Sequence, residues 1–181
     1  MPKSKPRASR KAPSARSKDA IALLKADHQE VSGWFGQFEK TKSDAKKSEL
    51  AEKICMALRV HTQIEEEIFY PAYIEATEDE DLHHEAIVEH DGAKQLISQI
   101  EASGPQDEYF DAKVKVLSEM IKHHVKEEEQ PGGMFAEARK SEMDLLTLGE
   151  QMRTRKKELM NGGGRAAGRS SSRSEIRQSA H

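Results

Sequence analysis

Four stretches of the chain place apolar residues at steps of three and four, the spacing that lines one face of an α-helix. Breaker-rich segments separate these stretches at TKSD (41–44), TEDED (77–81), SGPQD (103–107) and QPGG (130–133). Short connections between long helices favour antiparallel neighbours. The pattern therefore predicts an all-α protein, an up-down antiparallel four-helix bundle with an additional C-terminal helix.

Each of the four predicted helices carries six residues on its core-facing stripe. In the first helix they are Ile21, Leu24, His28, Val31, Phe35 and Phe38. In the second they are Ile54, Leu58, His61, Glu65, Ile68 and Ala72. In the third they are His83, Ala86, His90, Ala93, Ile97 and Ile100. In the fourth they are Phe110, Val114, Leu117, Ile121, His124 and Glu128. The fifth helix, from Met134 to about Met160, is expected to lie against the bundle as a cap.

Histidines interrupt the stripes at matching depths. His28 precedes the first interhelical turn by about as many residues as His61 follows it, and His90 and His124 stand in the same relation to the third turn. At a rise of 1.5 Å per residue, the levels within a pair differ by only about 5 Å. The four imidazoles are therefore expected to meet at one level of the bundle.

The polar positions also repeat along the chain. The second half reproduces the first at offsets of 62 residues (His28 to His90) and 63 residues (His61 to His124, Glu65 to Glu128). A two-helix unit used twice predicts a site with approximate two-fold symmetry. Left unpaired, each buried polar group would cost about 1–3 kcal/mol, so these residues need a common partner.

Histidine and glutamate at this spacing form a ligand set for metal ions. His61 with Glu65, and His124 with Glu128, are four residues apart and project from one helix face. The predicted ligands are His28, His61, Glu65, His90, His124 and Glu128. They offer each of two ions about two nitrogens and two oxygens. Imidazole and carboxylate without thiolate suit iron best, with manganese, zinc or copper less suited.

The same residues resemble the hemerythrin-like proteins of the HHE cation-binding family. The family pattern H, H-x-x-x-E, H, H-x-x-x-E is matched in order by the six predicted ligands. HTQIEEEIFYP and HHVKEEEQPGGMF resemble its two characteristic stretches, and MFAEARK with DLLTLGEQMRTRKKEL resembles its closing segment. The resemblance covers roughly residues 19–160. It implies a four-helix bundle around two non-haem iron ions, a di-iron centre.

One departure from the oxygen-carrying members affects the expected function. Those proteins take a fifth histidine from an H-x-x-x-H pair on the third helix, and here Ala86 stands four residues before His90. His83, one turn further out, is a candidate substitute. The resemblance implies binding of, or reaction with, O2, peroxide or NO in sensing, storage or detoxification. A catalase-like or oxidase enzyme, and an iron-responsive interaction module acting through the tails, remain alternatives.

Most residues next to the predicted ligands are expected to lie at the surface or to serve packing. A solvated face is expected for Glu66, Glu67, Glu127 and Glu129, with Glu66 a minor candidate for an outer partner of the ligands. An outward direction is expected for His84 and His123. Asp27 and Glu89 precede ligand histidines and could orient the imidazoles, although surface positions are the simpler expectation. Tyr70 and Tyr73 are expected to serve packing.

Charge is concentrated at the two ends of the chain. Residues 1–18 carry seven Lys or Arg and no acid, and residues 153–181 carry eight basic and two acidic residues. Residues 1–18 and 161–181 are predicted to be disordered tails around one domain, 19–160. The tails suit solubility, with nucleic acid or an acidic partner as the alternative. The acid-free N-terminus also resembles an organellar transit peptide.

The single cysteine, Cys55, excludes an internal disulfide and a cysteine-based zinc site. A single cysteine also fits a reducing compartment. Apolar runs are only a few residues long, so no membrane span is expected. These features predict a cytoplasmic protein.

Overall fold

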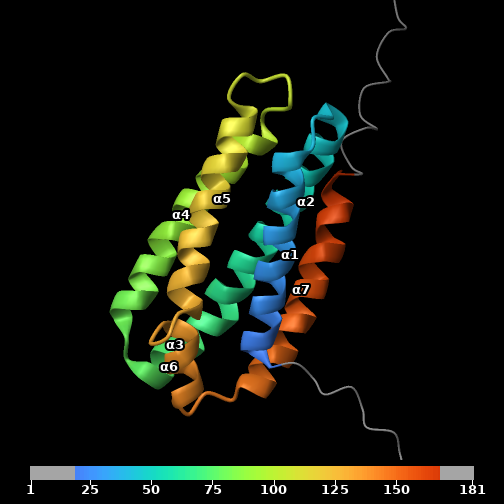
Figure 1. The fold of residues 1–181 in the computed structure, drawn as a ribbon. Helices are drawn as coiled ribbons and strands as arrows, with labels where there is room; N and C mark the ends of the chain where they lie inside the picture. The colour runs from blue at the N-terminus through green and yellow to red at the C-terminus, as the bar shows by residue number, and fades with distance from the viewer. Residues whose placement is uncertain (1–18, 168–181) are drawn as a thin grey trace, which may run out of the picture.

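The computed structural model describes residues 19–167, and every regular element in that range is helical. The elements are α1 (Ala20–Lys40), α2 (Asp44–Ile64), a π-helical turn η1 (Glu65–Phe69), α3 (Tyr70–Thr77), α4 (Glu80–Glu101), α5 (Phe110–Glu129), α6 (Met134–Lys140) and α7 (Leu145–Ala167). Figure 1 shows their arrangement. The prediction of an all-α fold is confirmed.

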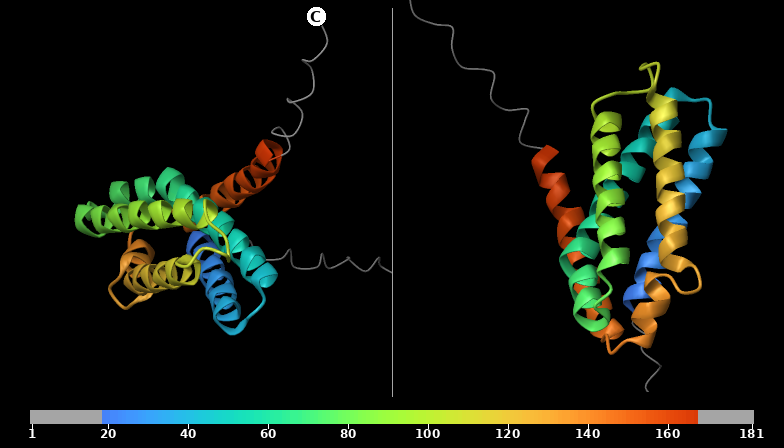
Figure 2. Two further views of the ribbon diagram at one scale, coloured as in Figure 1. Left: turned by 90° about the horizontal axis from the view of Figure 1, so that it is seen from above. Right: turned by 90° about the vertical axis from the view of Figure 1, so that its left-hand side faces the viewer.

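Four long helical segments form the bundle. Helix α1 pairs antiparallel with α2, α4 pairs with α5, and the two hairpins meet through contacts of α2 with α4 and of α1 with α5 (Figures 1 and 2). The first three predicted breaks fall between the observed helices, and QPGG follows the end of α5. The predicted up-down antiparallel four-helix bundle is therefore the observed architecture.

Side-chain caps explain where several helices begin. Asp19 accepts a hydrogen bond from the Ala22 N–H at 2.7 Å and so caps α1. Ser43 and Asp79 cap α2 and α4 in the same way, at 3.4 and 3.3 Å. A cap of this type stabilises a helix by about 1 kcal/mol. The predicted stripe of α1 is buried in full, which places the bundle core where its period indicated.

The second predicted helix changes register at η1. Ile68 and Ala72 were expected on the core stripe, but Phe69, Tyr70 and Tyr73 are buried instead. The Tyr70 N–H bonds the Glu65 carbonyl, five residues back, which inserts one extra residue into the turn. Pro71 accounts for this, because its ring has no N–H and would clash with the carbonyl four residues earlier in a regular α-helix.

The predicted fifth helix is two helices. It breaks between Lys140 and Leu145, and Asp144 caps the start of α7 by accepting the Thr147 N–H at 3.1 Å. Helix α6 contacts α5 and α3, whereas α7 lies alongside α1 and α2 instead of capping the bundle (Figure 2). The sequence KSEMD contains a serine and an aspartate that compete with helical hydrogen bonding, a signal that the prediction overlooked.

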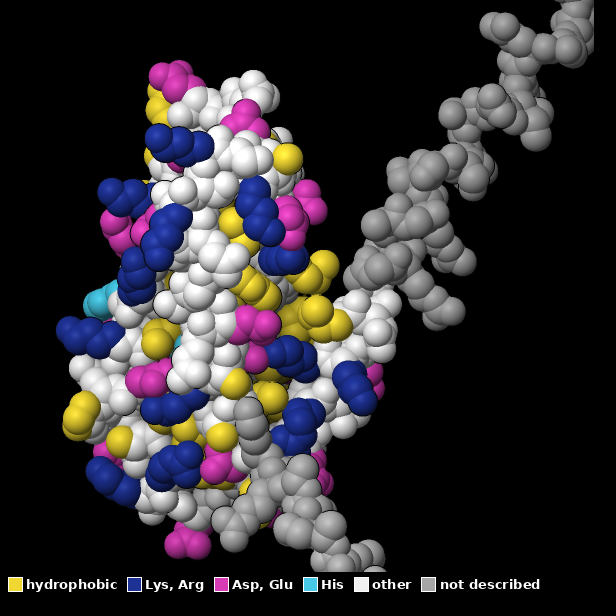
Figure 3. All heavy atoms as spheres, turned by 45° about the vertical axis from the view of Figure 1, so that its right-hand side comes forward, with side chains coloured by type: hydrophobic (Ala, Val, Ile, Leu, Met, Phe, Trp, Pro, Cys, Tyr) yellow, Lys and Arg dark blue, Asp and Glu magenta, His cyan; other side chains and the backbone are white. Residues whose placement is uncertain are grey.

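Helix α7 extends to Ala167, past the predicted end of the domain near Met160. The predicted tail 1–18 and residues 168–181 of the predicted C-terminal tail lie outside the described residues. Within residues 19–167, no helix is long and apolar enough to cross a membrane. Figure 3 shows basic and acidic side chains interspersed over the face that carries α7.

Candidate metal centre

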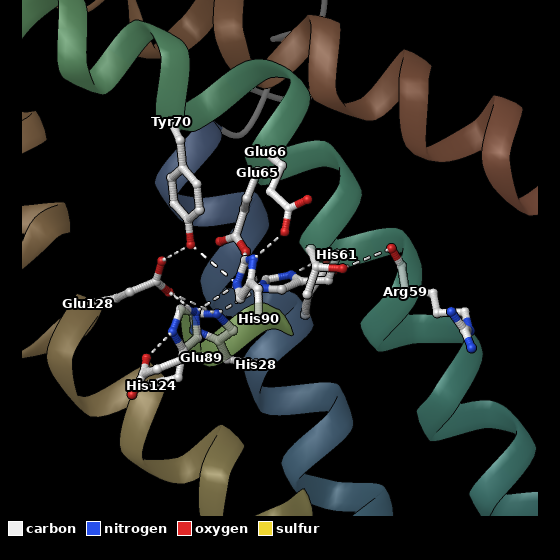
Figure 4. A network of polar contacts seen from close by, with 12 residues as sticks. His28, Arg59, His61, Glu65, Glu66, Tyr70, Glu89, His90, His124 and Glu128 are labelled. Atoms are coloured by element: carbon white, nitrogen blue, oxygen red, sulfur yellow. Dashed lines mark hydrogen bonds and ion pairs between the residues drawn. The ribbon is translucent and has the colours of Figure 1, made fainter. Parts of the chain in front are cut away.

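Four histidine side chains, one from each long helix of the bundle, point toward one another (Figure 4). The Nε2 atoms of His28 and His61 are 3.1 Å apart, and those of His90 and His124 are 3.3 Å apart. All four residues are buried. We call His28 with His61 the first histidine pair and His90 with His124 the second histidine pair.

Two glutamates lie between the histidine pairs. Glu65 Oε2 is 3.2 Å from His61 Nε2 and 3.4 Å from His90 Nε2. Glu128 Oε2 is 3.4 Å from His28 Nε2 and 3.6 Å from His124 Nε2. Each carboxylate thus contacts one histidine of each pair, so the structure brings all six predicted ligands together.

The donor geometry fits a pair of cations. Two nitrogens bound to one ion at about 2.1 Å, with an angle of about 90–110° between them, stand about 3.0–3.4 Å apart. Both measured Nε2 separations fall in this range. Both oxygens of Glu65, and Oε2 of Glu128, are buried and accept no hydrogen bond. Cations between the pairs would compensate the charge of these oxygens, and the clustered donors are all histidines and glutamates.

Each imidazole turns its Nδ1 toward an acidic residue. Glu129, Glu66 and Glu89 approach the Nδ1 atoms of His28, His90 and His124 at 2.8, 2.9 and 2.8 Å. Asp27 Oδ2 lies farther from His61 Nδ1, at 3.6 Å, and neither atom has a hydrogen-bond partner. A carboxylate at Nδ1 directs the Nε2 lone pair inward, as in many metal sites.

These four acids correct several sequence predictions. Glu129 does not belong to a purely solvated face, Asp27 and Glu89 are not simple surface acids, and Glu66 is the outer partner that it was only weakly expected to be. The sequence named Asp27, Glu89 and Glu66 only as alternatives and gave no signal for Glu129, because each acid reaches a histidine on another helix. The expectation holds for Glu67, which is exposed and pairs with Arg155, and for His84, which is exposed.

Lysines stand behind three of the four acids. Lys25 lies 3.0 Å from Glu129, Lys156 lies 2.5 Å from Asp27, and Lys94 lies 2.6 Å from Glu66. Each lysine keeps its carboxylate ionised and in place, because an adjacent ammonium favours the charged form. Lys156 belongs to α7, so the additional helix contributes to the surroundings of the centre.

The side chain of Tyr70 reaches the second histidine pair. Its hydroxyl lies 3.3 Å from His90 Nε2 and 3.4 Å from Glu128 Oε1. His83 belongs to none of the clusters of potential metal ligands among the described residues, and its ring packs against that of Tyr70 with the ring centroids 5.7 Å apart. In an α-helix, Tyr70 would point about 140° away from Glu65, and the π-turn brings both to one face. Tyr70 therefore does more than pack.

Without a cation, several groups of the centre have pKa values that differ from the usual ones. Burial lowers the pKa of His28 from 6.5 to about 3. Burial raises the pKa of Glu128 from 4.5 to about 7, despite the opposing effect of His124, and raises the pKa of Glu65 well above its usual value with help from the charge of Glu128. Burial disfavours the His124 cation, but Glu128 and Glu89 outweigh burial and raise its pKa. Cation binding would displace the carboxyl protons.

The fold and this cluster define a cation-binding helical bundle. Residues 19–131 match the family described as "Hemerythrin HHE cation binding domain". The chain belongs to that family. The match ends at Pro131, so α6 and α7 lie beyond it.

Two similar proteins add context. A "Hemerythrin HHE cation binding domain-containing protein" from Mycobacterium kansasii has a similar crystal structure, with a TM-score of 0.67 and 21% identity over 86% of this chain and 95% of that chain. This likeness supports the fold. A "DNA nickase" from Nostoc sp. is 28% identical over 107 residues, which are 59% of this chain and 30% of the nickase. The chain thus spans less than a third of that relative.

Proposed function

We propose that this protein binds two non-haem iron ions, one at each histidine pair, with Glu65 and Glu128 shared between them. The observation that carries this proposal is the pair of buried carboxylates whose unpartnered oxygens face four imidazole nitrogens. Removing such groups from water is unfavourable unless a charge of opposite sign compensates them. Imidazole and carboxylate donors without thiolate are suitable ligands for non-haem iron.

The small ligand of the centre is O2, peroxide or NO. A cavity of about 10 Å3 adjoins the four histidines, and Val31, Leu58 and Ile121 line its apolar side. This space corresponds to about one water-sized sphere, so it suits a molecule of very few atoms. The apolar wall limits access of bulk water, while Tyr70 presents a hydroxyl beside His90 and Glu128. Bound iron would supply reversible electron exchange with the ligand.

Metal analysis and optical spectra test the proposal together. Protein expressed in iron-rich medium is expected to contain about two irons per chain. The oxidised form should show charge-transfer bands that shift with azide and disappear on reduction. A preparation that takes up no transition metal, or only metal that dialysis removes, would rule the proposal out.

Exposure of the reduced protein to O2, NO and hydrogen peroxide then identifies the ligand. Reversible recovery of the reduced spectrum under vacuum indicates carriage or sensing of a gas. Continuous peroxide removal, faster than by the same amount of free iron, indicates an enzyme. Peroxide loss equal to that of free iron would reject catalase-like turnover.

A second function, in nucleic-acid transactions, is favoured by the similarity to the Nostoc nickase and by the basic segment 1–18. In this function the iron centre would control binding of the chain to nucleic acid through phosphate contacts. The test is a mobility-shift and plasmid-nicking assay with the full chain and a chain lacking residues 1–18. If neither the full chain nor the shortened chain binds nucleic acid at 50 mM salt, this function is ruled out.

A further inference from the structure

A second, outer cluster of potential metal ligands lies on the surface beside the centre. It consists of Glu89 on α4 with His123 and Glu127 on α5, whose ligand atoms all lie within 4.8 Å of one another. His123 Nε2 is 3.1 Å from Glu127 Oε1 and 3.4 Å from Glu89 Oε1. The His123 side chain is 59% exposed. We call these three residues the outer triad.

The outer triad is joined to the buried centre by one of its own members. Glu89 contacts His123 through Oε1 and the Nδ1 of the predicted ligand His124 through Oε2, at 2.8 Å. Figure 4 shows Glu89 directed toward His124. One carboxylate therefore touches both the surface cluster and the inner ligand set.

A small cavity adjoins members of both the outer triad and the buried centre. It has a volume of about 10 Å3, and its walls are formed by Glu89 and Glu127 of the outer triad, by His124 and Glu128 of the centre, and by Glu85, Leu82, Ala86 and Met134. Glu128 is 2% exposed, and its Oε2 accepts no hydrogen bond. A cavity of this size accommodates about one water-sized particle. The buried, unpartnered Glu128 carboxylate on its wall would attract a cation.

The other three acids around the histidines offer no comparable approach. Glu129, Asp27 and Glu66 each pair with a lysine ammonium, which repels an incoming cation. Glu89 has no lysine partner among the described residues and is flanked by His123 and Glu127 instead. Electrostatics therefore favour cation approach on the side of the outer triad.

We infer that the outer triad is a binding site for a divalent transition-metal ion and the loading point of the buried centre. One imidazole and two carboxylates, completed by water, suit Fe2+, Mn2+ or Zn2+. The ion would pass from Glu89 and Glu127 to Glu128 and His124 without a change of oxidation state. The loading role rests on the proposed iron centre, whereas cation binding at the surface does not.

Mn2+ binding tests the outer triad separately from the centre. The double variant Glu65→Gln/Glu128→Gln removes the charge of the inner carboxylates with little change in volume, and circular dichroism checks its fold. Electron paramagnetic resonance of free Mn2+ should show one ion still bound to it. Adding His123→Ala and Glu127→Gln should abolish that binding. Absence of the bound ion, or its persistence after removal of the triad, would overturn the outer site.

Loading kinetics test the route. Anaerobic Fe2+ uptake by the metal-free full chain, followed by stopped-flow absorbance, should slow by about tenfold in His123→Ala/Glu127→Gln, the size of many electrostatic steering effects. The final iron content should equal that of wild type. The matched control is Glu119→Gln, an exposed acid on the same helix outside the triad, which should load at the wild-type rate.

The outcomes separate the two proposals. A surface ion in the double variant, with no iron uptake by wild type, would refute the iron centre and the loading role but leave the outer site. Iron uptake by wild type with unchanged kinetics in the triad variant would refute the loading role. Slower uptake in both the triad variant and Glu119→Gln would mean that general surface charge, and not the triad, sets the rate. That result would also refute a specific route.

Discussion

The two histidine pairs occupy equivalent places in a repeated helical hairpin, yet their surroundings differ. Both pairs have nearly equal Nε2 separations, 3.1 and 3.3 Å. In the first pair, Asp27 lies 3.6 Å from the Nδ1 atom of His61 and forms an ion pair with Lys156 of α7. In the second pair, His124 holds Glu89 at 2.8 Å. Repetition thus reproduces the inner residues and the glutamate–lysine pairs behind His28 and His90, but not the acids behind His61 and His124.

The helices that carry the two glutamates also differ. Glu65 begins the π-turn that directs Tyr70 toward the second pair, whereas Glu128 lies in the regular last turn of α5. Tyr70 therefore makes the two histidine pairs inequivalent, because the hydrogen bond of its hydroxyl to a histidine goes to His90 of the second pair. A repeated helical hairpin can therefore give a centre whose two halves have different neighbours.

The largest expected effect tests whether the two pairs act as one centre. Because Glu65 contacts both pairs, Glu65→Gln is expected to weaken binding of both ions by more than about 100-fold, beyond the usual cost of losing an outer partner. Metal analysis after dialysis measures the loss. The matched variant Glu128→Gln should behave alike. Retention of one firmly held iron in either variant would show that the pairs bind independently.

The next effect concerns stability of the metal-free protein against pH. Burial raises the pKa of Glu128 from 4.5 to about 7, so the folded protein holds this proton more tightly than the unfolded chain does. The resulting stabilisation is complete below pH 4.5 and is lost as the pH rises to 7. Glutamine cannot ionise. Wild type should therefore lose on the order of 3 kcal/mol relative to Glu128→Gln over this interval. Urea unfolding at several pH values measures the difference, and parallel pH profiles would contradict the assignment.

The third prediction compares the acids behind the two pairs. Glu89 lies 2.8 Å from His124, whereas Asp27 lies 3.6 Å from His61. Glu89→Gln should lower metal affinity by about 10–100-fold, and Asp27→Asn should lower it less. Competition with a chromophoric chelator gives both affinities. Equal losses would mean that Asp27 closes on His61 when the metal binds.

The smallest effect tests the contribution of α7. Lys156→Met removes the ammonium beside Asp27 and keeps the aliphatic stem, so metal affinity should fall by only a few-fold, because a partly exposed ion pair is worth about 0–1 kcal/mol. The same chelator competition measures it. Lys157→Met, an exposed neighbour on α7, is the control. A loss as large as that of Glu89→Gln would give α7 a leading role.

Much of the bundle could be predicted because its signals are local or periodic. The stripe of α1 and the starts of α2 and α4 follow from apolar spacing and from capping residues such as Ser43 and Asp79. The break after Lys140 was missed because a continuous apolar pattern outweighed the short signal from Ser141 and Asp144. The metal role of the six ligands stays a prediction that their convergence supports.

The sequence by itself determined the all-α fold and the convergence of the four histidines, because helical period and turn position set the depth and face of each residue. Only the tertiary structure decided which acids hold the imidazoles and where Tyr70 points. Those contacts join different helices, and their partners follow from helix rotation and from the register shift at the π-turn before Pro71. Periodicity within one helix carries no information about such cross-helix contacts.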